Sequence, residues 1–200
     1  MEGEMGPMQV VTVAIVFLVF NVVHTYLVYY TGKAHYGEGT YDVEVFDVGH
    51  RLLPDAHSHG WWLNSIIPIV LLLLILGRSD RGNVFRRLFR SACPLLLVRM
   101  ITTVLTIPPP TKRMHACRTE HPALLHFLEG NCFDFLPSGH TIFVFTACAA
   151  LFSLGTPIAT VLIITQMIIL VLTRAHYTVD VVASAILAYA FDCAGFELPM

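Results

Sequence analysis

TIFVFTACAALFSLGTPIATVLIITQMIILVLT, residues 141–173, contains no charged side chain. As a single helix this run would be about 50 Å long, which exceeds the roughly 30 Å hydrocarbon layer of a membrane. The tripeptide Gly155-Thr156-Pro157 lies near its middle and is typical of a turn. The run therefore predicts two membrane helices joined by a short connection.

Apolar runs recur along the rest of the chain, which has 200 residues, is 56% hydrophobic and only 13% charged, and has a mean hydropathy of +0.68. A soluble domain does not need so apolar a composition. The sequence predicts an all-α, polytopic membrane protein: one catalytic domain over residues 1–200, built as a bundle of six transmembrane helices. The expected spans are about 8–30, 60–77, 88–107, 137–154, 157–174 and 177–194.

Charge distribution predicts the orientation of these spans. Residues 78–90 contain five arginines and one aspartate, and a short arginine-rich loop is typical of the cytoplasmic side. Both termini then lie inside, and loops 31–59 and 108–136 lie outside with His140 and His176. The acidic start of the chain favours an uncleaved anchor over a signal peptide. A net charge of -2 gives no basic field for nucleic acid.

Two short segments border the run at 141–173, LPSGHT at 136–141 and TRAHYTVD at 173–180, and together they gather two histidines, an aspartate, an arginine and a serine. His176 and Asp180 are four residues apart, so on a helix they share a face and the carboxylate can orient the imidazole. This spacing predicts a nucleophile or base with its orienting partner.

The first of these segments suits a phosphate. Gly139 allows a tight turn, and a helix that begins there leaves free amides for an anion, while His140 can give or take a proton. Arg174 and the mid-span Arg99 supply positive charge. Structural roles stay open for two of these residues: Asp180 as a helix-start residue, and Arg99 as a side chain that extends toward the membrane interface.

Residues 133–141 (FDFLPSGHT) and 176–180 (HYTVD) together resemble the sphingomyelin synthase branch of the lipid phosphatase and phosphotransferase superfamily, which includes inositol phosphorylceramide synthases. Weaker likenesses lie at 52–55 (LLPD) and 99–117. Hydrolases of the superfamily usually carry an arginine six residues before the second histidine and an Arg-Pro pair. Leu170 fills that place here and no Arg-Pro pair exists, which favours a transferase.

The resemblance implies transfer of a phospho-headgroup, phosphocholine first, from a glycerophospholipid to ceramide without metal or cofactor, releasing diacylglycerol. His176, held by Asp180, would be the nucleophile, and His140 the acid and base. Glu120, Glu129 and Asp134 are alternatives for orienting His140. The residues expected to bind substrate are Arg99, Ser138, Gly139, Arg174, Tyr177 and Asp134.

The expected partners are a phospholipid donor and a ceramide or diacylglycerol acceptor within the membrane, and a homo-oligomer stays open. The resemblance implies the Golgi or plasma membrane, with the site facing the lumen or the cell exterior. The sequence leaves open whether the headgroup is choline, ethanolamine or inositol, and whether Cys117 and Cys132 pair. Alternatives are a phosphatase or phospholipase C-like hydrolase with the same triad, and a non-catalytic lipid-binding protein or transporter.

Overall fold

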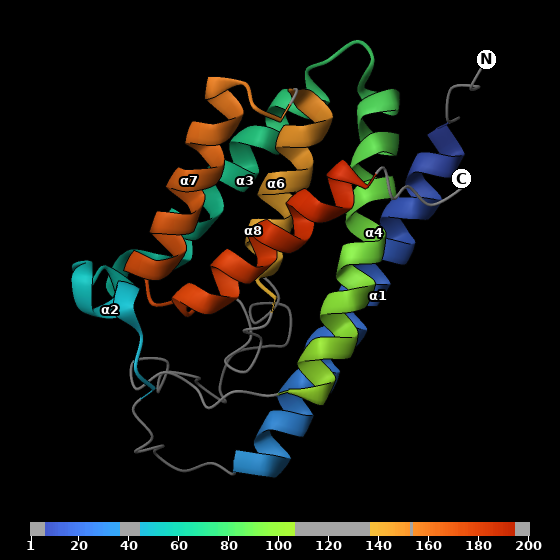
Figure 1. The fold of residues 1–200 in the computed structure, drawn as a ribbon. Coiled ribbons are helices and arrows are strands. Elements are labelled where there is room, and N and C mark those ends of the chain that lie inside the picture. Colours follow the sequence, from blue (N-terminus) through green and yellow to red (C-terminus); the bar gives the residue numbers. More distant parts are fainter. Residues whose placement is uncertain (1–6, 37–44, 107–136, 153, 195–200) are drawn as a thin grey trace.

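The computed structural model describes residues 7–36, 45–106, 137–152 and 154–194, and all regular structure within them is helical (Figure 1). This confirms the predicted all-helical class for those ranges. Within the same ranges, no helix combines the length and the apolar character needed to cross a membrane. The long helices are α1 (Pro7–Tyr36), α3 (Gly60–Leu76), α4 (Arg81–Leu105), α6 (Gly139–Leu151), α7 (Pro157–Leu172) and α8 (Thr178–Cys193), and the short ones are α2 (Val48–Leu52) and η1 (His57–His59).

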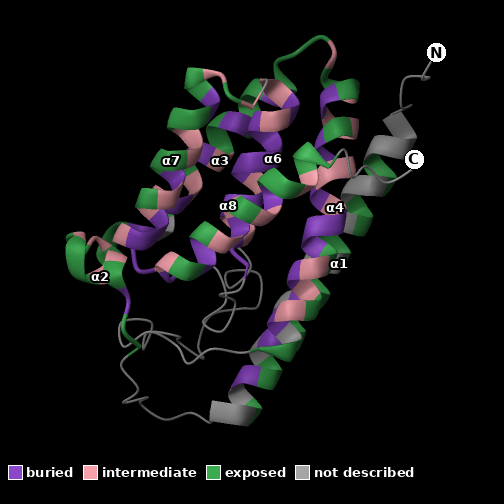
Figure 2. Ribbon diagram, viewed as in Figure 1, coloured by how far each residue is buried: buried purple, intermediate pink, exposed green. Residues whose placement is uncertain are grey.

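Helix α6 lies at the centre and contacts α3, α4, α7 and α8. Small buried side chains on α6, Ala147, Cys148 and Ala150, let its neighbours approach closely. One core cluster packs these residues against Leu71 and Ile75 of α3 and against parts of α4 and α7. Figure 2 shows the buried positions gathered along α6 and the inner faces of its neighbours. The helix that begins at Gly139 is thus fixed from several sides.

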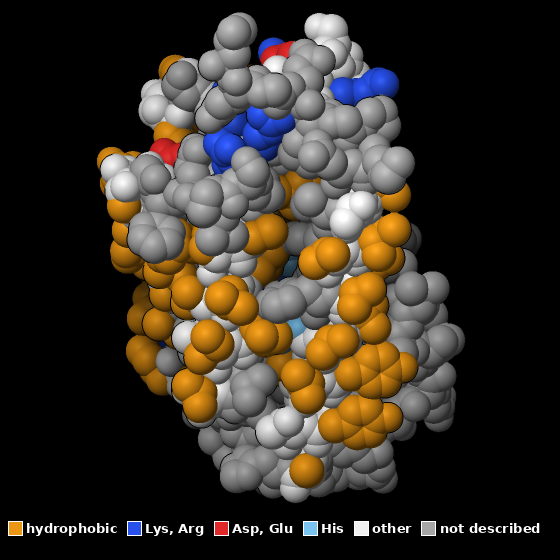
Figure 3. All heavy atoms as spheres, turned by 90° about the vertical axis from the view of Figure 1, so that its right-hand side faces the viewer, with side chains coloured by type: hydrophobic (Ala, Val, Ile, Leu, Met, Phe, Trp, Pro, Cys, Tyr) orange, Lys and Arg blue, Asp and Glu red, His pale blue; other side chains and the backbone are white. Residues whose placement is uncertain are grey.

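Apolar side chains also cover the outside of the bundle. Leu73 on α3, Val161 on α7 and Ile186 on α8 are each more than 60% exposed. Figure 3 shows hydrophobic side chains over much of one face, with Lys and Arg side chains gathered toward one end of it. A surface of this kind is typical of a protein that contacts lipid or a partner.

The arginine-rich segment was predicted as a loop, and most of that prediction is wrong. Helix α4 begins at Arg81, so residues 81–90 are helical and only the short stretch 77–80 joins α3 to α4. Arginine and leucine favour a helix, and the arginines extend it without breaking it. In the connection, Arg78 Nε donates a hydrogen bond to Asp80 Oδ1 at 2.6 Å.

The turn predicted at 155–157 is confirmed. Gly155 has a φ of 98°, a conformation that disfavours any side chain, and Pro157 is the first residue of α7. Helix α1 extends to Tyr36, beyond the expected end near residue 30.

Candidate active site

The PSGH segment forms the start of α6. Ser138 is the N-cap, and its Oγ accepts a hydrogen bond from the amide of Thr141 at 3.3 Å. Serine is favoured here because its hydroxyl satisfies an amide that the first turn leaves without an intrahelical partner. His140, half-buried, follows in that first turn. The imidazole therefore lies at the positive end of the α6 dipole.

Arg99 of α4 reaches this same turn. Its side chain is buried, and its guanidinium lies so close to Gly139 that a Cβ at this position would be 2.8 Å from Cζ and 3.2 Å from Nη2. A glycine is what permits this approach. The structure thus brings together two predicted substrate-binding residues, and places a cation beside the residue that precedes His140.

His176 comes from a tight turn between α7 and α8. The amides of Arg174 and Ala175 donate to the carbonyls of Val171 and Leu170 at 3.2 and 3.1 Å, and Arg174 has a φ of 58°. These two bonds with one left-handed residue form a Schellman motif, a position usually filled by glycine. Helix α8 begins only at Thr178, so the expectation that His176 and Asp180 share a helical face is wrong.

His176 and Asp180 are nevertheless close. The distance from His176 Nδ1 to Asp180 Oδ2 is 3.8 Å, which is within ion-pair range, and both side chains are buried. The same Oδ2 accepts the amide of Tyr177 at 3.0 Å. Asp180 therefore has the helix-start role that was left open for it, and also lies beside the imidazole.

The rings of His140 and His176 lie close together in an edge-to-face arrangement. The ring centroids of His140 and His176 are 6.2 Å apart, and the ring planes are inclined by 67°. Ser184 of α8 ties their segments together, because its Oγ accepts the amide of Ser138 at 2.6 Å and donates to the carbonyl of Asp180. Two imidazoles that are distant in sequence are thus held close enough together to contact the same small substrate group.

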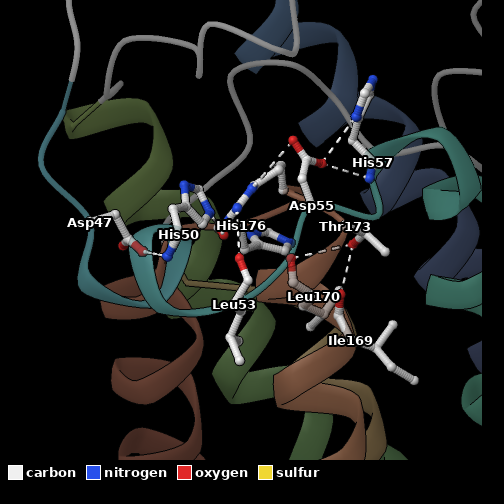
Figure 4. A network of polar contacts seen from close by, with 10 residues as sticks. Asp47, His50, Leu53, Asp55, His57, Ile169, Leu170, Thr173 and His176 are labelled. Carbon is white, nitrogen blue, oxygen red and sulfur yellow. Dashed lines mark hydrogen bonds and ion pairs between the residues drawn. The ribbon is translucent and has the colours of Figure 1, made fainter.

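The polar segment within residues 31–59, called the first polar loop below, adds site residues that sequence reasoning missed (Figure 4). His50 Nε2 lies 3.0 Å from the carbonyl oxygen of His176, and Asp47 binds the first residue of α8. Arg174 Nη2 donates to the carbonyl of Leu53 at 3.0 Å, and its Nε lies 4.0 Å from Asp55 Oδ2. The LLPD segment at 52–55 therefore lies against the turn that carries His176.

These loop groups have shifted pKa values. Burial favours neutral Asp47, but hydrogen bonds from the Thr178 hydroxyl and from the His50 and Thr178 amides outweigh it and lower the pKa of Asp47. Burial lowers the pKa of His50, against the influence of the His176 carbonyl and the Asp47 carboxylate. Near neutral pH, Asp47 is therefore ionised and His50 neutral.

Local signals existed for some of the missed residues. An aspartate immediately before residues 48–52 is a helix N-cap signal, and Ser184 follows Asp180 by one helical turn. Asp134, Glu120 and Glu129, which were expected to bind substrate or orient His140, lie outside the described residues, as do Cys117 and Cys132. For Ser138, Arg174 and Tyr177, a role in substrate binding stays a prediction.

The arrangement of His140, His176 and Asp180 lies within one segment that other proteins share. Residues 131–192 match the family model described as PAP2 superfamily C-terminal. The match contains both histidines and the aspartate, and supports a phosphatase or phosphotransferase type of function on lipid phosphates. The PAP2 match is coarser than the resemblance to sphingomyelin synthases and does not select that branch. No curated protein matches the chain.

Proposed function

We propose that the protein is a membrane enzyme that transfers a phospho-headgroup, phosphocholine first, from a glycerophospholipid to ceramide and releases diacylglycerol. The observation that carries this proposal is the close pair of imidazoles, His140 and His176, with ring centroids 6.2 Å apart. The PAP2 match over residues 131–192 supports chemistry on a lipid phosphate. The HYTVD and FDFLPSGHT segments favour the sphingomyelin synthase type of acceptor.

In the proposed first step, Nε2 of His176 attacks phosphorus, because Nδ1 is the nitrogen that lies toward Asp180. The N–P bond forms as the P–O bond to glycerol breaks, and protonated His140 gives its proton to the departing diacylglycerol oxygen. In the second step, His140 takes the proton of the ceramide hydroxyl. That oxygen then bonds to phosphorus and the N–P bond breaks, which restores both imidazoles.

Positive charge supports this chemistry on the α6 side of the pair. The buried guanidinium of Arg99 lies against Gly139, and the first turn of α6 directs its amides toward the same region. Together they suit the non-bridging oxygens of a phosphodiester, whose charge grows in the transition state. Asp180 stabilises the positive charge that His176 carries while it is phosphorylated.

We further propose that the six apolar runs span a bilayer, with the histidine pair on the luminal or extracellular side in the Golgi or plasma membrane. The support is the exposed apolar surface of α1, α3, α7 and α8. Water must be kept from a phosphohistidine for transfer to exceed hydrolysis, and an embedded site achieves this.

The test is lipid mass spectrometry on the purified protein in liposomes of phosphatidylcholine with and without ceramide. We expect sphingomyelin and diacylglycerol to form in equal amounts and only with ceramide. His140→Ala is expected to slow transfer by roughly 10²–10⁴-fold, and His176→Ala to abolish it. His59→Ala, an exposed histidine outside the pair, is the matched control and keeps full activity. Unchanged transfer by either alanine variant of the pair would falsify the proposal.

A hydrolase with the same triad is the second candidate, and the PAP2 match favours it equally at the level of the superfamily. It would release phosphocholine from phosphatidylcholine at the same rate whether or not ceramide is present. Replacing the donor by phosphatidylethanolamine or phosphatidylinositol in the same assay identifies the headgroup.

A further inference from the structure

Asp47 joins two helices through one carboxylate. Its Oδ1 accepts the His50 amide at 2.8 Å, which caps α2, and also accepts the Thr178 hydroxyl at 2.7 Å. Its Oδ2 accepts the Thr178 amide at 2.7 Å, in the first turn of α8. A single buried side chain thus fixes where α2 lies relative to the start of α8.

Helix α2 approaches the start of α8 so closely that only glycine fits at position 49. The Gly49 amide donates to Thr178 Oγ1 at 3.2 Å. A Cβ on Gly49 would overlap Thr178 Oγ1 and lie 2.7 Å from Cγ1 of Val171 at the end of α7. Helix α2 therefore packs against both ends of the turn that contains His176.

The turn is held at three points along its backbone and side chains. His50 Nε2, protonated in the neutral ring, donates to the carbonyl of His176 at 3.0 Å, and the His50 ring lies 5.5 Å from that of Tyr177. Arg174 binds the Leu53 carbonyl on one side, and Thr178 binds Asp47 on the other. His176 has no helix of its own, so these contacts fix the direction in which its ring projects.

We propose that residues 47–53 form a clasp that positions His176 for reaction with the lipid phosphate, with Asp47 and His50 as positioning residues that do not touch substrate. The inference rests on the proposed function. A nucleophile displaced by about 1 Å from its reactive geometry loses on the order of 100-fold in rate. Contacts that define the His176 backbone therefore act on the chemical step more than on the binding of lipid.

The test removes one hydroxyl and restores it. Thr178→Val keeps the shape of the side chain but loses the hydroxyl's bonds to Asp47 Oδ1 and to the Gly49 amide, while the amide bond to Asp47 Oδ2 remains. Thr178→Ser keeps the hydroxyl. We expect kcat for headgroup transfer to fall about 10- to 100-fold in Thr178→Val with KM changed less than twofold, and Thr178→Ser to recover most of it. Gly49→Ala should reproduce the loss. Thr160→Val, the same change at an exposed hydroxyl in the first turn of α7, leaves kcat unchanged.

A second readout does not depend on activity. Modification of His176 by diethylpyrocarbonate, measured by mass spectrometry on folded protein, is expected to be several-fold faster in Thr178→Val than in the wild type, with His59 unchanged. If the wild type shows no transfer activity but His176 is still modified faster in Thr178→Val, the proposed function is overturned and the clasp is kept. Equal His176 modification in the two proteins, or a Thr178→Val variant with wild-type kcat, would overturn the clasp.

Discussion

A single carboxylate, Asp47, makes the link between the first polar loop and α8 sensitive to acid. Hydrogen bonds overcome the effect of burial and lower its pKa, so the folded state prefers the ionised form more than the unfolded chain does. Its contribution to stability is therefore complete above the ordinary aspartate pKa of about 4 and is lost as the pH falls through the lowered value. His50 acts in the same direction at higher pH, since its pKa is lowered and protonation opposes the fold below about pH 6.5.

We predict that Asp47→Asn unfolds more easily than the wild type at pH 7, by about 1–3 kcal/mol, because a charged acceptor of several hydrogen bonds is lost. The difference should shrink as the pH falls below about 4, where the wild-type carboxylate becomes protonated. Thermal unfolding in detergent from pH 3 to 8 measures this. The control is Asp80→Asn: Arg78 lowers the pKa of Asp80 too, but that ion pair is exposed and contributes little. A constant difference between the Asp47 variant and wild type at every pH would contradict the assignment.

Sequence reasoning identified some of the site residues for a clear reason. His140, His176 and Asp180 stand beside glycine, serine and threonine at the edges of apolar runs, where few other groups can react. His50 could not be identified in this way, because loop 31–59 holds several histidines and carboxylates with no local feature that ranks them. Its importance comes from a contact with a residue 126 positions away, which only the folded chain reveals.

At the scale of the elements, the turn between α7 and α8 stores backbone strain. Arg174 occupies the left-handed position of a Schellman motif with a φ of 58°, where a side chain costs about 1–2 kcal/mol. Its guanidinium compensates by binding the Leu53 carbonyl and approaching Asp55. The chain therefore places arginine where glycine is usual, so that one residue both ends α7 and ties the turn to the LLPD segment.

We predict that Arg174→Gly is more stable than Arg174→Ala by about 1 kcal/mol, because both lose the guanidinium but only alanine keeps the left-handed strain. Thermal unfolding of the two variants measures the difference. Both should show reduced headgroup transfer, since the tie to Leu53 is lost in each. An alanine variant as stable as the glycine variant would show that the backbone relaxes out of the left-handed conformation.

The element boundaries show where local patterns fail. Residues 81–90 were expected to be a loop because they are charged, yet arginine is a good helix former and α4 runs through them. His176 and Asp180 were expected on one helix because they are four residues apart, but the Asp180 carboxylate accepts the Tyr177 amide and α8 begins only at Thr178. Helix propensity decided the first boundary and side-chain chemistry at the helix start decided the second, whereas hydropathy decided neither.

For the whole molecule, the apolar runs predicted the long helices but not their arrangement. Runs such as residues 66–76 are apolar on every side, so the sequence pattern does not mark which face turns inward. The central place of α6 follows from its small residues, which let α3, α4 and α7 pack against it. The pairing of His140 with His176 depends on this arrangement, because α6 and α8 must meet near their first turns.

The proposed six-span topology makes a last prediction that the fold alone does not test. If the α3–α4 connection is cytoplasmic and loop 31–59 lies on the opposite side, Asp80→Cys and His57→Cys should react with a membrane-impermeant maleimide from opposite faces of the membrane. Both positions are exposed or partly exposed, so the reagent can reach them. The native Cys93, Cys148 and Cys193 must first be replaced by serine or alanine together with Cys117 and Cys132, since Cys193 is exposed.

In sealed vesicles of known orientation, the thiol of His57→Cys should be labelled only on the luminal or extracellular face, and that of Asp80→Cys only after the vesicles are opened or inverted. If both thiols were labelled from the same face, α3 would not cross the membrane. That result would also place the histidine pair and the arginine-rich start of α4 in one compartment, which the proposed orientation does not allow.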